Sequence, residues 1–210
     1  VHINLSVLQM LRLDKLVHSH GLTLYQLFLF LWALLLCRHA EQHTVVIGSP
    51  YHGRDASGTD LLIGFFINML GLCISMPQGS SVESMLKNVS SVASGALCHA
   101  GLPFQQAVNE LLLDHNHDAS RNVVFQSMLV WGDAAGASYG GGTFDFSDNL
   151  QVRPTTPSEQ GVSKVDLTLN SAARSKSFSG TIEFCVDLFA RESIEHVAAR
   201  LVVLSAALGD

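Results

Sequence analysis

Hydrophobic residues recur along the chain with two different periods, and these periods predict helices alternating with strands. Leucines recur at helical spacing within residues 5–18, so this segment is expected to form a helix that Gly21 ends. Residues 24–40 are apolar on nearly all sides, which is typical of a helix buried on most of its surface. The apolar stretch at residues 22–37 contains Gln26 and is shorter than the roughly 18 residues that a membrane span needs, which favours a buried helix.

Beyond the second helix, the pattern changes to short stretches that predict strands. Residues 43–50 are β-branched and end at Pro50, whereas residues 63–76 form a long apolar run that two glycines interrupt. Residues 164–170 and 178–186 alternate apolar and polar positions, which predicts an antiparallel pair. The other expected elements are strands at 122–131 and 149–153, helices at 81–100, 103–113 and 191–207, a loop at 51–60 and a glycine-rich irregular segment at 132–161.

Composition narrows the class of protein. Hydrophobic residues make up 48% of the 210 residues and charged residues only 14%, so part of the apolar surface is expected to meet a partner. The net charge of −6 and the lack of a Lys/Arg cluster exclude nucleic-acid binding, which needs a basic face. The four cysteines are widely spaced with no CxxC pair, which favours a reducing cytosol over a disulfide framework. The length fits one domain or lobe, and the start at Val1 suggests an excised segment.

Two motifs with possible chemistry are not supported by their surroundings. The GxSxG match at residues 136–140 is followed by more glycines instead of a helix, so a flexible loop is expected there and not a nucleophilic serine. Histidines stand in close pairs at 18 and 20, 39 and 43, and 115 and 117, but no pair has an obvious third ligand. No metal site is therefore predicted.

Four segments follow one another in a fixed order: GSPYHGR at residues 48–54, IGFFINML at 63–70, HAGLPFQ at 99–105 and HDASRNVVFQ at 117–126. The first, third and fourth are similar to the patterns G-[ST]-P-x-x-x-R, H-Q-x-x-P-F-E and R-D-x-S-x-x-P-L-F-Q. With the second segment, these are the motifs of condensation domains of nonribosomal peptide synthetases, and the chain resembles that family over nearly its whole length. It departs from the motifs at His117, Val123 and Ala100-Gly101.

The resemblance implies one α/β lobe of a pair of chloramphenicol-acetyltransferase-like lobes. Residues 1–210 correspond to the C-terminal lobe, with a mixed sheet flanked by helices. Residues 132–161 would be the crossover, or latch, to the other lobe, and the loop after Pro50 the floor of a tunnel between the lobes. The catalytic HHxxxDG motif lies in the N-terminal lobe of the family, and this chain contains no His-His pair. We therefore assign no catalytic residue and expect the isolated chain to be inactive.

The activity that the resemblance implies is amide bond formation between two carrier-bound aminoacyl or peptidyl thioesters. No cofactor would bind directly, because carrier domains deliver phosphopantetheine-tethered substrates. The expected partners are the N-terminal condensation lobe, the upstream and downstream peptidyl carrier domains and an adjacent adenylation domain, all in the cytoplasm, without nucleic acid or membrane. One alternative is a non-catalytic condensation-like module that docks carrier domains or recruits a partner enzyme. Another is an acyltransferase of the same superfamily that uses coenzyme A or a free alcohol.

The motifs also name candidate site residues. Substrate-binding roles fall to Asn68, Phe66 and Gln126; Asn68 is a lone amide in an apolar strand and needs hydrogen-bond partners, so a structural amide is the alternative. Arg54 is expected to anchor its loop through a carboxylate, and His99 to stand at a helix end. The residues expected to hold the motifs in place are Gly48, Pro50, Arg54, Gly64, His99, Pro103, Phe104, Asp118 and Phe125.

Overall fold

The computed structural model describes residues 1–112, 121–133, 144–147, 150–152, 163–174 and 177–209. Six strands form one mixed sheet in the order β1-β8-β7-β4-β2-β3, in which β4 runs parallel to β2 and β7 and the other neighbours are antiparallel. These strands are β1 (His2–Leu5), β2 (Thr44–Tyr51), β3 (Asn68–Ser75), β4 (Ser127–Asp133), β7 (Leu167–Arg174) and β8 (Ser177–Phe184). A separate antiparallel pair joins β5 (Phe144–Ser147) to β6 (Leu150–Val152).

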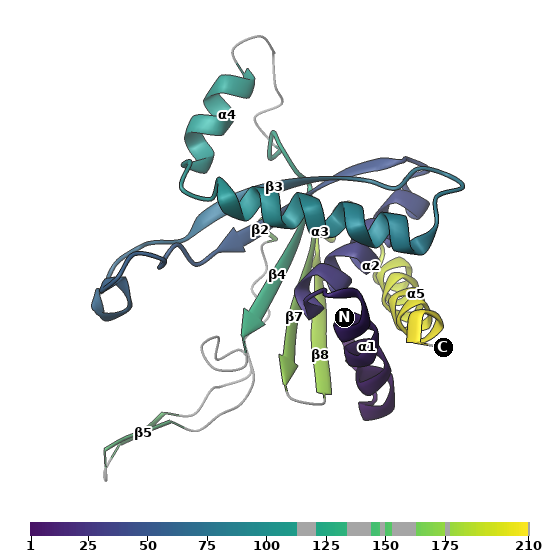
Figure 1. The fold of residues 1–210 in the computed structure, drawn as a ribbon, viewed down its shortest axis with the longest axis horizontal. Coiled ribbons are helices and arrows are strands. Elements are labelled where there is room, and N and C mark those ends of the chain that lie inside the picture. The colour runs from purple at the N-terminus through teal and green to yellow at the C-terminus, as the bar shows by residue number, and fades with distance from the viewer. Residues whose placement is uncertain (113–120, 134–143, 148–149, 153–162, 175–176, 210) are drawn as a thin grey trace.

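Four of the helices pack against the sheet and against one another. Figure 1 shows α1, α2, α3 and α5 grouped on one side of the strands, whereas α4 stands apart from them. The bounds are α1 (Val7–His20), α2 (Leu24–His39), α3 (Val82–Cys98), α4 (Phe104–Leu112) and α5 (Arg191–Gly209), with one 3-10 turn, η1 (Thr59–Leu61).

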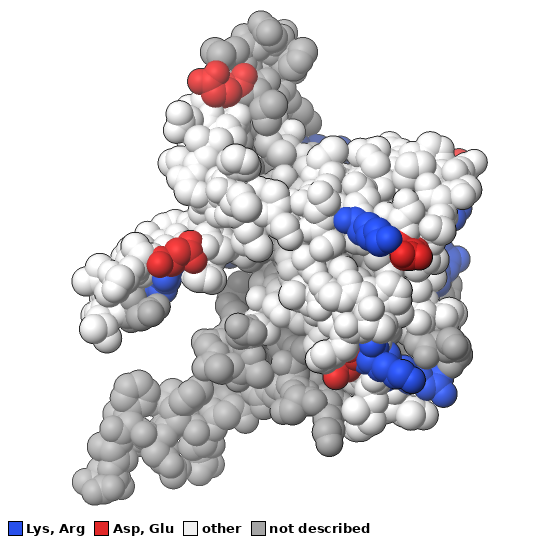
Figure 2. All heavy atoms as spheres, viewed as in Figure 1, with Lys and Arg blue, Asp and Glu red and all other residues white. Residues whose placement is uncertain are grey.

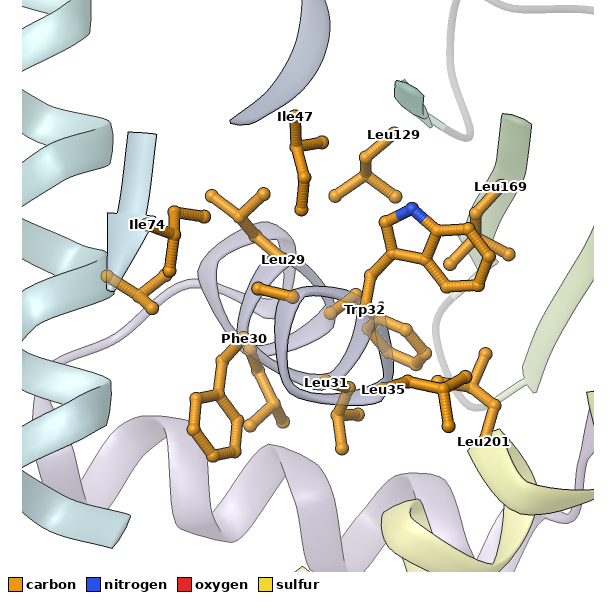
Figure 3. Packing of buried hydrophobic residues seen from close by; sticks show 14 of the residues in the cluster. Leu29, Phe30, Leu31, Trp32, Leu35, Ile47, Ile74, Leu129, Leu169 and Leu201 are labelled. Carbon is orange, nitrogen blue, oxygen red and sulfur yellow. The ribbon is translucent and has the colours of Figure 1, made fainter. Parts of the chain in front are cut away.

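Helix α2 is the centre of the core, as its all-round apolar sequence predicts. Figure 3 shows its side chains pointing towards Ile47, Leu129 and Leu169 of the sheet and towards Leu201 of α5. The indole N–H of Trp32 donates to Ser127 Oγ at 2.9 Å, so the one polar atom of this large buried side chain is satisfied. A capping box between Thr23 and Gln26 begins the helix.

One face of the sheet is covered and the other is not covered by these helices. Buried strand residues such as Ile3, Leu72 and Ile182 belong to a single core cluster with α1, α2, α3 and α5. On strands β3 and β8 the alternate positions are exposed or half-buried, and Cys73 and Glu183 are among the exposed ones. Side chains alternate between the two faces of a strand, so this burial pattern identifies one buried face.

Several predicted element bounds were wrong, and at two of them a local side-chain contact decides the boundary. The first helix starts at Val7 instead of residue 5, because Ser6 and Gln9 form a capping box there and residues 2–5 pair with β8 as an edge strand. Residues 63–67 precede β3 and are not part of it. Residues 122–126 precede β4, since Asn122 Oδ1 accepts from the backbone N–H groups of Val124 and Phe125 in a turn.

Two other predicted elements are confirmed. The antiparallel pairing of β7 with β8 has Leu169 opposite Ile182, and β6 falls within the strand predicted at residues 149–153. Strand β5 was not predicted. All four cysteines are free thiols. In the described part of the chain no single helix has the length and hydropathy of a membrane span; α1 and α2 meet those criteria only as a pair bent by 104°.

Candidate functional site

Segments of all four sequence motifs meet where β2 and β3 lie side by side. Gly48 of β2 stands opposite Gly71 of β3, and both face away from the helix-covered core. A Cβ atom on Gly48 would lie 2.4 Å from the ring of Phe125, and one on Gly71 would lie 3.2 Å from Val124 Cγ1. The paired glycines therefore leave the space that residues 124 and 125 fill. Gly71 was noted in the sequence only as an interruption, so its packing role was missed.

The aromatic residues of the third and fourth motifs are in contact at the same place. The rings of Phe104 and Phe125 have centroids 5.6 Å apart and are tilted by 42°. Phe125 is almost fully buried at 2% exposure. Pro103 stands directly before α4, and its carbonyl accepts from Gln106 and Ala107, as expected for a proline at a helix start. The motifs thus fix α4 on the outer side of the β2–β3 pair.

Asn68, the first residue of β3, joins this cluster through its carboxamide. Its Nδ2 donates to the carbonyl oxygens of Ala100 at 2.8 Å and Leu102 at 2.7 Å. Its Oδ1 accepts from the backbone N–H groups of Phe104 at 3.0 Å and Met69 at 2.9 Å. Both amide hydrogens and the oxygen are used within the chain, which is the structural alternative left open by the sequence. That Asn68 contacts substrate stays a prediction.

Residues 52–67 join β2 to β3, and we call this loop the arm. Arg54 organises it: its guanidinium donates to the carbonyl oxygens of Thr59, of Leu62 at 3.0 Å and of Gly64 at 3.5 Å. The same group lies 4.3 Å above the Phe66 ring, a cation–π distance. Arg54 therefore does anchor its loop, but the carboxylate partner expected from the sequence was wrong for the contacts described, which go to backbone carbonyls. Carbonyls that converge within one loop suit the planar donor fork of arginine.

The first turn of the arm is fixed by Gly53 and by a polar cluster. Gly53 has φ of +64°, and a Cβ atom there would lie 2.0 Å from the carbonyl oxygen of Phe66. The Tyr51 hydroxyl donates to the Asp55 carboxylate, and this hydrogen bond raises the pKa of Tyr51 above its ordinary value. His52 Nδ1 accepts from the Arg54 backbone N–H at 3.0 Å.

Large apolar side chains are exposed along the returning half of the arm. Leu61 and Phe65 are each 89% exposed, and Ile63 is fully exposed. Leu62 and Ile67 are about half exposed. Figure 1 shows the arm extending beyond the ends of β2 and β3, and Figure 2 shows it standing clear of the body of the molecule. A contiguous apolar surface of this kind marks an interaction site.

Among the contacts described, the remaining candidate residues make no hydrogen bond to the Asn68 carboxamide. Gln126 is exposed and its Nε2 donates to the Asn122 carbonyl at 2.8 Å, while its backbone carbonyl accepts from Leu167. His99 is the C-cap of α3, which confirms the expected helix end. Pro50 pairs with Met69. Asp118 lies outside the described residues, and substrate contacts by Phe66 and Gln126 stay predictions.

The chemistry available at this cluster is positioning and apolar contact. Within the residues that the structure describes, no three His, Cys, Asp or Glu side chains converge as metal ligands would. The hydrogen bonds of Asn68 and Arg54 go to backbone groups, so these side chains hold segments in place.

Comparison with known proteins gives concordant matches. The family model described as "Condensation domain" matches residues 1–208. The chain is 33% identical over 200 residues to bacitracin synthase 3 of Bacillus licheniformis and 31% identical over 193 residues to tyrocidine synthase 3 of Brevibacillus parabrevis. These matches cover 94% and 92% of this chain but only 3% of each relative.

Solved structures share the fold at lower sequence identity. The X-domain from teicoplanin biosynthesis superposes with a TM-score of 0.85 at 23% identity, and the match covers all of this chain and 46% of that one. A four-domain nonribosomal peptide synthetase bound to AMP and glycine gives a TM-score of 0.87 at 18% identity, with 16% of that chain covered. For the first condensation domain of the calcium-dependent antibiotic synthetase in complex with a substrate analogue, the TM-score is 0.73 at 17% identity, over 44% of that chain.

Proposed function

The chain belongs to the condensation domain family, and we propose that it is the C-terminal half of such a domain in a nonribosomal peptide synthetase, where it forms one wall of the substrate tunnel. The predicted mixed α/β fold is that of condensation domains. The chain spans under half of the solved condensation-domain structure that it matches and a few per cent of the synthetases. The activity proposed below is therefore that of the whole domain, to which this chain would contribute.

The observation that carries the proposal is the exposed arm beside the motif cluster. Five large apolar side chains between Leu61 and Ile67 are about half to fully exposed, although Arg54 holds the loop in a defined shape. An ordered apolar loop that stands in water needs a partner surface to bury it. A second half of the same domain would supply that surface, and the arm would form the floor between the two halves.

The sheet face opposite the helices supports the proposed wall. On this face the alternation places Cys73 of β3, Met128 and Val130 of β4, and Asn170 of β7, and each of them is exposed or half-buried. The face is apolar near β3 and β4 and more polar towards β7 and β8. A wall of this kind would orient two thioester-bound substrates and exclude water from them.

The proposed reaction joins an upstream acyl group to a downstream amine. The amine nitrogen of the acceptor attacks the thioester carbonyl of the donor, the C–N bond forms, and the C–S bond breaks. The phosphopantetheine thiol of the upstream carrier leaves, and the proton lost by the amine balances the thiolate. A histidine acting as general base contributes typically 10²- to 10⁴-fold. It would come from an HHxxxDG motif in the other half, because this chain has none.

Amide formation in the parent protein is the direct test. The parent synthetase is supplied with a donor-loaded upstream carrier and an acceptor-loaded downstream carrier, and intact-protein mass spectrometry follows the downstream carrier. The proposal predicts that the mass of the downstream carrier increases by the mass of the transferred acyl group. This increase should disappear when the second histidine of HHxxxDG is replaced by alanine. Parent sequence without that motif, or no transfer with loaded carriers, would contradict it.

The second candidate is a non-catalytic condensation-like module. A chain in a solved complex of the X-domain and OxyB from teicoplanin biosynthesis shares the fold of this chain, with a TM-score of 0.82 at 23% identity. The departures from the third and fourth motifs at Ala100-Gly101, His117 and Val123 motivate this alternative. However, Asn68 binds the carbonyls of Ala100 and Leu102, and backbone contacts do not depend on which side chain stands there. Carrier binding without acyl transfer in the same assay would favour this candidate.

A further inference from the structure

The carboxamide of Asn68 makes four hydrogen bonds at a junction of three chain segments. It belongs to β3, its Nδ2 binds the carbonyls of Ala100 and Leu102 in the connection from α3, and its Oδ1 binds the first N–H of α4 at Phe104. The fourth bond, from Met69 N–H to Oδ1, fixes the side chain relative to its own strand. With both donors and both oxygen lone pairs occupied, the group is saturated.

The arm ends at this junction. Its last residue is Ile67, and Asn68 pairs with Tyr51, the residue before the arm begins. The junction therefore ties the base of the arm to the start of α4. From α4 the contact continues through the Phe104 and Phe125 rings to Gly48 on β2. Four motif segments thus form one closed set of contacts around the base of the arm.

We infer that Asn68 is a positioning residue of the condensation reaction: its carboxamide sets where the arm stands relative to α4, without touching substrate. This inference rests on the proposed function, in which the arm meets the other half of the domain. A residue that only adds stability would affect the whole fold, whereas a positioning residue affects the arm and the reaction selectively.

Asn88 is a matched control for this distinction. It is also a half-buried asparagine, and its Nδ2 donates to the carbonyl of Ser75 at 3.0 Å, so it ties α3 to the opposite end of the same strand. Loss of either amide removes hydrogen bonds to β3. Only the loss of Asn68 frees the base of the arm.

The first test compares hydrogen exchange in the parent protein carrying Asn68→Ala or Asn88→Ala. The inference predicts that exchange of the arm amides and of the first turn of α4 rises by about tenfold in Asn68→Ala, because local opening no longer breaks those bonds. Exchange in these segments stays at the wild-type rate in Asn88→Ala. Equal changes in the two variants would overturn the inference.

The second test is the pH profile of amide formation in Asn68→Asp, with Asn88→Asp as control. An ionised carboxylate at position 68 cannot donate and faces two carbonyl oxygens, whereas its protonated form recovers one donor. The inference predicts that kcat of Asn68→Asp falls by about tenfold or more at neutral pH and partly recovers in acid, relative to wild type. A profile parallel to that of Asn88→Asp would overturn it. A wild-type parent without amide product would contradict the proposed function instead, and hydrogen exchange would then decide the role of Asn68.

Discussion

At the scale of single residues, close packing explains the glycine at position 48 of the first motif, and hydrogen bonding explains the asparagine at position 68 of the second. Gly48 and Asn68 were both recognised in the sequence, but their contact partners were not, because each partner lies more than 30 residues away along the chain. The ring of Phe125 occupies the space above Gly48, and Asn68 binds carbonyls at positions 100 and 102. Nothing local in the sequence specifies such contacts.

Replacing Gly48 by alanine tests the close packing against Phe125. The new methyl group would lie 2.4 Å from a buried ring, so overpacking should lower the free energy of unfolding by about 1–3 kcal/mol. The matched control is Gly95→Ala, because Gly95 lies within α3 with open space around its Cα. That change should raise the free energy of unfolding by about 0.5–1 kcal/mol. Urea denaturation of both variants checks that the free energy of unfolding falls in Gly48→Ala and rises in Gly95→Ala. An unchanged free energy of unfolding in Gly48→Ala would contradict the close packing against Phe125.

Arg54→Lys tests whether the planar guanidinium organises the arm. Lysine keeps the charge but lacks the fork that reaches the carbonyls of Leu62 and Gly64. We expect faster proteolytic cleavage within residues 52–67, with the melting temperature nearly unchanged because the arm lies outside the core. Arg191→Lys, at an exposed pair with Glu195, is the control and should leave cleavage of the arm at the wild-type rate. Equal cleavage rates in Arg54→Lys and wild type would argue against this role.

At the scale of elements, the sequence predicted interiors better than ends. The buried helix α2 follows from its all-round apolar sequence and the β7–β8 hairpin from its alternating pattern, and both are present. The extent of β1, β3 and β4 does not follow from such patterns. The capping box at Ser6 directly follows the last residue of β1. The carboxamide junction at Asn68 stands at the start of β3, and the turn at Asn122 precedes β4.

The contact between α2 and α5 should make stability depend on pH. Arg200 Nη1 lies 3.0 Å from His39 Nε2, and because arginine is only a donor, the imidazole nitrogen must accept and be neutral. Burial, followed by the charge of Arg200, lowers the pKa of His39. A group with a lowered folded-state pKa stabilises above its unfolded pKa and loses that contribution as the pH falls through the folded pKa.

His39→Gln measures this contribution. The variant removes the titration, so its melting temperature relative to wild type should rise as the pH is lowered from about 8 to about 5. His43→Gln, which changes a histidine just after the same helix, is the control. A difference between His39→Gln and wild type that stays constant with pH would contradict the assigned protonation state.

At the scale of the whole molecule, the exposed apolar surface supports the proposal that the chain is one half of a larger unit. Its core is complete on the helix side, while the arm and the opposite sheet face carry apolar side chains in contact with solvent. The low charged fraction in the sequence predicted apolar surface for a partner. The position of this apolar surface could not be predicted, because residues 61–67 have a composition that suits a buried strand and an exposed apolar loop equally well.

Cross-linking from the arm tests the central claim most directly. A photoreactive residue replaces Phe65 in the parent protein, with the same residue at Val203 of α5 as an exposed apolar control, and mass spectrometry locates the cross-linked peptides. The proposed half-domain predicts that position 65 reacts with the segment preceding this chain in the parent and that position 203 does not. Cross-links from position 65 only to a second copy or to a carrier domain would contradict it.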